Sequence, residues 1–192
     1  MGDRVDFRFR TASPVSSPLA VDPGGQIYIA THEGYLHALG PDGRFLWSYT
    51  VNGALLHGVV ADGDKGALLA SSKGLVYSLR QDGVARWVFQ LPVTPEGPLR
   101  IDERRAAHFL AGSYLYAVSS RAGVLWRAGF AAAPSGNDFY EALSGETWLT
   151  TADGALHAVR TPARRQQWAL GKDFSAAVLL AVSAELAFVP FD

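Results

Sequence analysis

The 192-residue sequence contains no cysteine, which excludes a disulfide framework and a thiolate metal site within these residues. It has no apolar run of about eighteen residues, the length of a membrane-spanning helix, and its first residues lack the apolar core of a signal peptide. The 17 Lys and Arg residues nearly balance the 18 Asp and Glu residues, giving a net charge of −1. Without a clustered basic face, no nucleic-acid partner is expected.

A repeat is the main feature that is present. Five aromatic residues recur at intervals of 40, 40, 39 and 42 residues, and they are Phe7, Trp47, Trp87, Trp126 and Trp168. A fixed period near forty residues is typical of repeat architectures such as propellers. We therefore treat these five aromatics as structural repeat positions that pack where neighbouring repeats meet.

Each repeat unit contains one well-preserved strand with apolar residues at alternate positions. In the first unit it spans residues 34–39, where Leu36 and Ala38 share a face, and the equivalents span 74–79, 113–118 and 154–159. Asp42-Gly43 and Asp82-Gly83 follow the first two copies and are strong hairpin signals. Period-two alternation interrupted by frequent turn residues nearly excludes helix.

The predicted fold is therefore all-β, a β-propeller of four-stranded antiparallel blades in a single domain covering residues 1–192. We expect about four complete blades and a partial or composite fifth, in which residues 176–190 supply two strands and residues 5–10 a third. Two alternatives are a fragment of a larger propeller and completion of the ring by a second chain. The complete blades are expected at approximately 17–51, 57–91, 97–131 and 139–170.

Residues 34–47 and 74–87 carry the pattern Gly-x-Leu/Val-His/Tyr-Ala/Ser-Leu, an Asp-Gly turn and a Trp. This pattern resembles the pyrroloquinoline-quinone-like (PQQ-like) propeller repeat, and the resemblance covers essentially the whole chain. Members of that superfamily include quinoprotein alcohol dehydrogenases, a propeller lipoprotein of outer-membrane protein assembly, and sensor or scaffold domains. The dehydrogenases use adjacent cysteines and a calcium site, which this sequence does not match. We therefore expect no enzyme activity and no cofactor or metal.

The histidines offer little evidence of catalysis. His37 and His157 occupy the repeat position of tyrosines in other units, and His108 lies within an apolar strand, so all three are interpreted as structural. His32 and His57 lie in loops and have more freedom to contact a ligand. Residues 62–66 resemble part of a calcium loop but lack the later ligand positions, so we interpret them as a turn.

The candidate binding surface is the rim formed by the loops between blades and by the turns that precede the best-preserved strands. Residues 131–140 form the longest such loop, which is interpreted either as a contact loop or as a tolerated insertion. Rigid β scaffolds commonly carry function on loops of this kind. The predicted rim residues are His32, Glu33, His57, Lys73, Glu96, Asn137, Asp138, Phe139 and Lys172.

The sequence thus predicts a non-enzymatic binding or scaffold module that presents these loops to a protein or peptide partner. A quinone-dependent oxidoreductase domain and a structural fragment without independent function are the alternatives. Unpaired blade edges also allow a homodimer. The family resemblance alone favours an exported, periplasmic or cell-envelope location, with any targeting segment removed or outside these residues.

Overall fold

The computed structural model describes residues 7–16, 18–55, 57–62, 66–102, 106–119, 123–136, 139–142 and 145–160, together with the backbone of 164–169. Within these ranges the chain forms four separate antiparallel sheets, each of four strands in sequence order. The all-β fold predicted from the alternating pattern is confirmed.

The strands of the four blades follow one another with short connections. The first two blades comprise β1 (Ala20–Val21), β2 (Ile27–Ala30), β3 (Tyr35–Leu39) and β4 (Phe45–Thr50), then β5 (Val59–Asp62), β6 (Gly66–Ala70), β7 (Leu75–Arg80) and β8 (Ala85–Gln90). The last two comprise β9 (Pro95–Ile101), β10 (Ala106–Ala111), β11 (Tyr114–Ser119) and β12 (Gly123–Gly129), then β13 (Tyr140–Glu141), β14 (Glu146–Thr150), β15 (Ala155–Arg160) and β16 (Arg164–Ala169). In each blade we call the strands A to D in this order.

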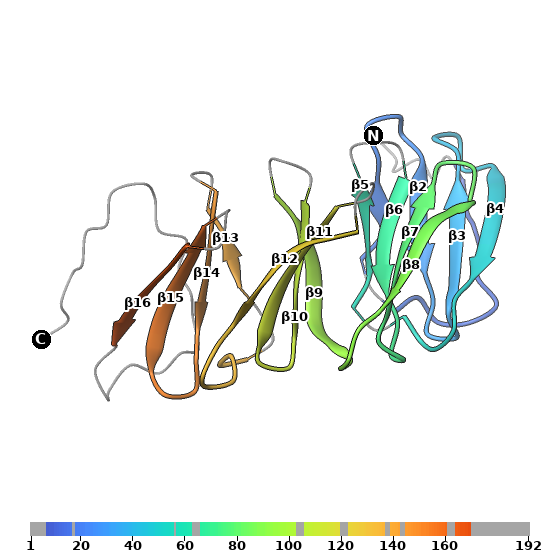
Figure 1. Ribbon diagram of the computed structural model, residues 1–192. Helices are drawn as coiled ribbons and strands as arrows, with labels where there is room; N and C mark the ends of the chain where they lie inside the picture. The colour runs from blue at the N-terminus through green and yellow to red at the C-terminus, as the bar shows by residue number, and fades with distance from the viewer. Residues whose placement is uncertain are drawn as a thin grey trace, which may run out of the picture.

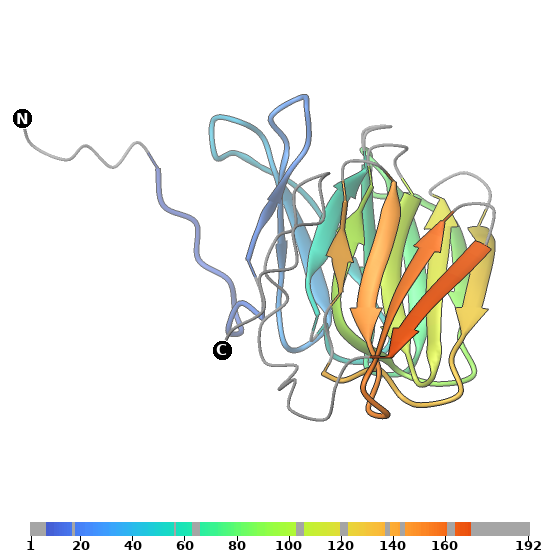
Figure 2. The same ribbon diagram turned by 90° about the vertical axis from the view of Figure 1, so that its left-hand side faces the viewer.

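The blades stand side by side along an open arc, with the first blade at one end and the fourth at the other (Figures 1 and 2). Strands A of the first three blades contact one another on the inside of the arc, whereas strand D of each blade forms its outer edge. This is the arrangement of a propeller, in which one four-stranded sheet covers the face of the next.

Each junction between blades has its own apolar cluster. The cluster between the first and second blades includes Tyr28 and Leu36 from one sheet and Leu69 and Leu79 from the next, all fully buried. Two further clusters lie at the second and third junctions. One repeat tryptophan packs against each cluster in a partly buried position, and the three are Trp47, Trp87 and Trp126.

Trp47 also reaches across to the second blade. Its indole Nε1 donates a hydrogen bond of 2.7 Å to the backbone oxygen of Gln81, and its ring covers Gly83, where an added Cβ would lie 2.8 Å from the ring. Gly83 has φ of +84° in the predicted Asp-Gly turn, a conformation that favours glycine. The turn glycine therefore serves both the hairpin and the packing of the neighbouring blade.

The fourth blade departs from the predicted repeat. In strand D of the first three blades a bulge sets Trp47 opposite Ala38, Trp87 opposite Ser78 and Trp126 opposite Ala117. In the fourth, β15 and β16 pair without a bulge, and Trp168 lies opposite Leu156 rather than Ala158. The irregular sequence that replaces the Asp-Gly turn changes the register, so Trp168 lies two residues away along β15 from the position that the repeat predicts.

Residues 7–16 precede the first blade without forming a strand. Nevertheless Phe7 covers Gly43, where an added Cβ would lie 2.3 Å from its ring, as Trp47 covers Gly83. The predicted equivalence of Phe7 and Trp47 therefore extends to their packing. Residues 5, 6 and 176–190, the remainder of the predicted composite blade, lie outside the described residues.

Candidate protein-binding rim

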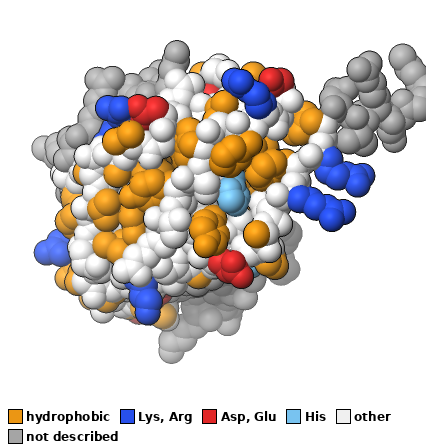
Figure 3. Space-filling view, turned by 90° about the vertical axis from the view of Figure 1, so that its right-hand side faces the viewer, with side chains coloured by type: hydrophobic (Ala, Val, Ile, Leu, Met, Phe, Trp, Pro, Cys, Tyr) orange, Lys and Arg blue, Asp and Glu red, His pale blue; other side chains and the backbone are white. Residues whose placement is uncertain are grey.

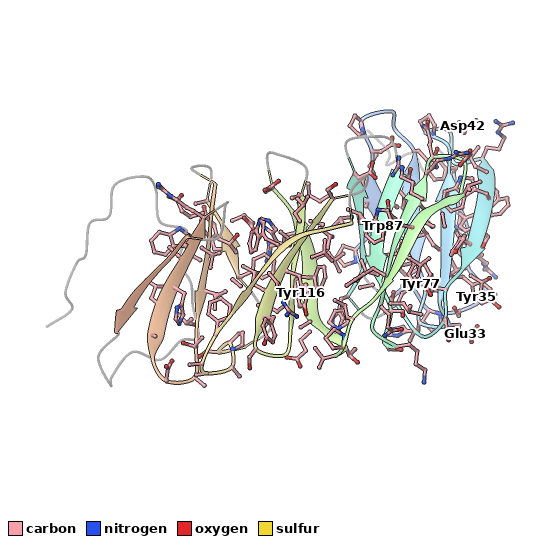
Figure 4. The ribbon with its side chains drawn as sticks, viewed as in Figure 1. Glu33, Tyr35, Asp42, Tyr77, Trp87 and Tyr116 are labelled. Atoms are coloured by element: carbon pink, nitrogen blue, oxygen red, sulfur yellow. The ribbon has the colours of Figure 1, made fainter. Side chains whose placement is uncertain are left out.

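The loops that link strand D of one blade to strand A of the next lie on the same side of the propeller as the turns between strands B and C, at one end of the strands. Glu33, in the first of these turns, is labelled at this end in Figure 4, whereas Asp42 lies in a turn at the opposite end. We call this end the D–A rim. It is built from the loops predicted from the sequence.

Backbone hydrogen bonds join two of the rim loops to the B–C turn of the following blade. The Ser72 amide donates to the Ala54 carbonyl at 2.8 Å, and the Ala152 amide donates to the Ala133 carbonyl at 2.8 Å. The Ser72 hydroxyl oxygen also accepts from the Ala54 amide at 3.0 Å. The rim thus presents loops whose positions depend on contacts between blades.

Tight backbone packing explains the glycine that opens the best-preserved strand. Gly34 has φ of +86°, and an added Cβ would lie 2.4 Å from the Gly53 carbonyl oxygen. The Gly34 carbonyl accepts from the Val51 amide at 2.9 Å. A larger residue would both strain this backbone and push the D–A loop away.

The predicted rim residues of the first three blades are accessible. His32, Glu33, Lys73 and Glu96 are exposed, and His57 is half-buried. Burial lowers the pKa of His57, while a hydrogen bond with the Pro95 backbone and the nearby Glu96 charge partly oppose that shift. The exposed side chains offer charges of both signs to a partner.

The rim residues predicted after the third and fourth blades have a different outcome. Phe139 is 3% exposed and packs in the third junction cluster with Leu110 and Leu149, with the Arg100 guanidinium 5.9 Å from its ring centre. It is a core residue rather than a contact residue. Asn137, Asp138 and Lys172 lie outside the described residues.

A buried polar cluster joins the third and fourth blades. The His108 Nδ1 atom contacts the Glu141 carboxylate, whose two oxygens each accept at 3.0 Å from the Thr147 hydroxyl. The Asp102 carboxylate lies 3.7 Å from His108 Nε2, and the Trp126 ring lies 5.3 Å from the imidazole, centre to centre. Because the His108 side chain is 3% exposed, the cluster acts as a polar link between sheets. The structural interpretation of His108 agrees with this burial.

The aspartates that end strand A support the A–B turns. Asp22 accepts from the amides of Gly24 at 2.8 Å and Gln26 at 3.0 Å, and Asp62 pairs with Arg86 at 2.6 Å. Residues 63–65 of the segment that resembles a calcium loop lie outside the described residues. Among the described residues, no group of three or more His, Asp or Glu side chains is arranged to hold a metal ion.

Comparison with known families adds a second line of evidence. The family model PQQ_2, described as outer membrane protein assembly factor BamB, matches residues 4–164. The chain belongs to this family. The BamB-like assignment agrees with the PQQ-like repeat recognised in residues 34–47 and 74–87. A comparison with curated proteins gives no match.

Three solved structures place the BamB-like chain among propeller proteins. BamB from Moraxella catarrhalis is 16% identical with a TM-score of 0.65, over 86% of this chain and 56% of the other. A streptogramin B lyase is 13% identical with a TM-score of 0.66, over 88% and 59%. BBS1N in complex with ARL6DN is 13% identical with a TM-score of 0.64, over 85% and 57%.

The chain therefore spans little more than half the length of these solved structures. At such identities the likeness concerns the fold alone. Within the part of the chain that the structure describes, no helix has the length and apolar character needed to cross a membrane.

Proposed function

We propose that this chain is a non-enzymatic protein-interaction module that uses the D–A rim to bind a protein or peptide partner. The observation that carries the proposal is the BamB family match over residues 4–164, because the name of that family describes an assembly factor for other proteins. The fold supplies a rigid frame, and the rim supplies accessible loops.

The chemistry of the rim favours a polar partner surface of mixed charge. Glu33, Lys73 and Glu96 are exposed on it, and exposed charges of both signs steer and orient a protein partner more than they add affinity. Backbone bonds such as that of 2.8 Å between Ser72 and Ala54 hold the loops in place, which reduces the entropy lost on binding.

Two solved propeller relatives support binding to protein as a use of this fold. BamB is named for outer membrane protein assembly, and BBS1N was solved in complex with ARL6DN. By the same family argument we propose an exported location at the cell envelope, facing the periplasm.

Site-specific photo-crosslinking tests the rim as the binding surface. A photoreactive amino acid at Lys73, on the rim, is compared with one at Val84, which is 53% exposed in the turn between strands C and D of the second blade. In cells that express the chain naturally, we expect the Lys73 probe to capture one defined protein and the Val84 probe to capture none of it. Equal capture from both positions would contradict rim binding.

The non-enzymatic part has a separate test. Pyrroloquinoline quinone and calcium are added to the purified chain, and its melting temperature is measured. A ligand that binds the native state raises the melting temperature by linkage, so we expect no change. A rise of several degrees that depends on both additions would instead support the quinone-dependent alternative.

A further inference from the structure

An arginine on the outer edge of the third blade is held against an aromatic ring and not by a carboxylate. Arg127, on β12, is exposed, and its guanidinium carbon lies 5.0 Å from the ring centre of Tyr114, the first residue of β11. Three other arginines form ion pairs with acidic side chains, and they are Arg80, Arg86 and Arg160. Within the residues that the structure describes, Arg127 forms no such pair. The Tyr114 ring therefore orients a cation whose charge remains available.

The repeat itself does not require this arginine. Arg127 directly follows the repeat tryptophan of its strand, and the residues that follow the tryptophans of the first two blades are Ser48 and Val88. Neither of these carries a charge, although both belong to blades of the same architecture. Blade packing alone therefore does not account for an arginine at this position.

The first blade shows the same position without the arginine. Tyr35, the copy of Tyr114, stacks on His37 with the ring centres 6.1 Å apart. Figure 3 looks onto the end of the molecule that carries this blade and shows hydrophobic side chains close to a histidine. In this view the Lys and Arg side chains lie around the hydrophobic ones rather than among them. A cation held on an aromatic ring thus distinguishes the third blade from the first.

Arg127 and Tyr114 border the D–A rim beside an exposed valine. Tyr114 follows the B–C turn, and Val93 of the preceding D–A loop lies against that turn, where a Cβ added at Gly112 would be 3.4 Å from the valine Cγ2. Val93 is 43% exposed and Tyr114 is 38% exposed. The junction of the second and third blades therefore combines one cation with an accessible aliphatic and an accessible aromatic side chain.

The loop that carries Val93 lacks a hydrogen bond that its copy in the preceding junction has. There the Tyr77 hydroxyl accepts from the Asn52 amide at 2.9 Å. In the third blade Tyr116 occupies the position of Tyr77, and both are labelled in Figure 4. The residue at the position of Asn52 is Pro92, which has no amide hydrogen to donate. Among the described residues the buried Tyr116 hydroxyl has no hydrogen-bond partner, so this loop adjusts to an incoming segment at lower cost.

We infer that the surface made of Arg127, Tyr114 and Val93, which we call the Arg127 site, binds an acidic side chain of the rim's protein partner. The inference rests on the proposed function, because it names the chemistry that one part of the rim recognises. The guanidinium presents paired N–H donors that match a carboxylate. An apolar side chain next to that acid in the partner covers Val93 and the accessible part of the Tyr114 ring, which removes apolar surface from water.

A matched pair of short peptides tests the Arg127 site on the whole chain. Both peptides contain leucine and serine and have blocked ends, and one carries glutamate where the other carries glutamine. Fluorescence anisotropy measures their affinities. We expect the parent chain to bind the glutamate peptide about tenfold more tightly, and Arg127→Gln to abolish this preference. The control is Arg44→Gln, which removes an exposed arginine beside the C–D turn of the first blade and should keep the preference.

A second variant keeps the test informative where Arg127→Gln fails to fold. Tyr114→Leu introduces the residue type of its copy in the second blade, Leu75, and leaves the cation without its ring, so we expect the preference to fall severalfold. Equal affinity of the parent chain for the two peptides, or a preference that survives both substitutions, would overturn the inference.

Two further results would also overturn the Arg127 site as a site for acidic side chains. They are binding confined to a peptide with a free C-terminus, and displacement of the glutamate peptide by a short single-stranded oligonucleotide at equal concentration. The crosslinking test at Lys73 is separate from these measurements. A partner captured at Lys73, together with equal affinity for the two peptides, would leave rim binding standing and remove only the Arg127 site.

Discussion

Among single residues, Gly83 shows how closely the turn of one blade depends on its neighbour. Gly83 and Gly123 both have positive φ, +84° and +75°, but only Gly83 lies under a neighbouring ring, that of Trp47. Comparing alanine substitutions at the two glycines therefore separates the free-energy cost of the backbone conformation from the cost of displaced packing between blades.

We predict that Gly123→Ala lowers the free energy of unfolding by about 1 kcal/mol, the cost of a left-handed conformation for a residue with Cβ. Gly83→Ala should cost distinctly more, because the new methyl group also displaces the Trp47 indole and weakens its bond to Gln81. Urea denaturation followed by tryptophan fluorescence measures both. Equal losses in the two variants would show that the contact between Trp47 and Gly83 contributes nothing.

Histidines give the chain a pH-dependent stability. Burial lowers the pKa of His37 and of His57 below the ordinary value of 6.5. The unfolded chain therefore takes up protons at higher pH than the folded chain does. Their contribution to stability is complete above pH 6.5 and is lost as the pH falls through that value.

We therefore predict that the free energy of unfolding decreases between about pH 7.5 and about pH 5.5, and that His37→Gln makes this decrease shallower. Exposed His32, changed to Gln, is the control and should leave the slope as it is in the parent chain. Denaturation midpoints across this pH range provide the measurement. If the free energy of unfolding of the parent chain stays constant on acidification, the lowered pKa values of His37 and His57 are wrong.

At the scale of strands, a buried polar cluster links β10 to β13 and β14, in addition to the apolar cluster and the tryptophan at the same junction. His108 contacts Glu141 and lies 3.3 Å from the Thr147 hydroxyl. Removing the imidazole leaves the partly buried Glu141 carboxylate without one of its partners.

We predict that His108→Ala lowers the free energy of unfolding by about 1–3 kcal/mol, the usual cost of an unsatisfied buried polar group. The double variant His108→Leu with Glu141→Leu removes both partners and should be less destabilised than His108→Ala. Chemical denaturation of the three chains tests this order. A double variant less stable than His108→Ala would contradict this expectation, because it would show that the contact between His108 and Glu141 itself adds net stability.

Strands were predicted best where alternation and turn chemistry agree. The segment 34–39 was expected as a strand and β3 occupies Tyr35–Leu39, because its apolar face and its flanking glycine turn act together. Strand A was harder to predict. β9 starts at Pro95, two residues before the expected blade boundary at 97, because Pro95 pairs with Ala111 and so extends the strand past Gly97-Pro98.

The candidate site was predicted only in part, because the repeat places loop positions but does not show which side chains meet between blades. Loop positions such as Glu33 and Lys73 follow from the repeat, and both are exposed. Phe139 was placed on the rim because it follows a long loop, although its 40-residue spacing from Leu99 indicates a core position. The link between His108 and Glu141 joins residues 33 positions apart on two blades, and no local pattern encodes such a pair.

At the scale of the whole molecule, one architecture explains both the fold and the rim. Repeated sheets cover one another along an arc, and the loops between them collect at one end. The loops that contain Ala54 and Ala133 are held by the turn of the following blade, so a partner at the rim would meet a surface organised by several blades.

The central claim is that the D–A rim binds the partner, and a pair of charge reversals at opposite ends of one blade tests it most directly. Glu33 and Asp42 are both exposed acids, and Figure 4 shows them at opposite ends of the first blade. The affinity of the protein captured through Lys73 is measured by calorimetry for Glu33→Lys and Asp42→Lys. We predict a loss of about tenfold, near 1.4 kcal/mol, for Glu33→Lys and no change for Asp42→Lys; a loss confined to Asp42→Lys, or none in either variant, would contradict the account.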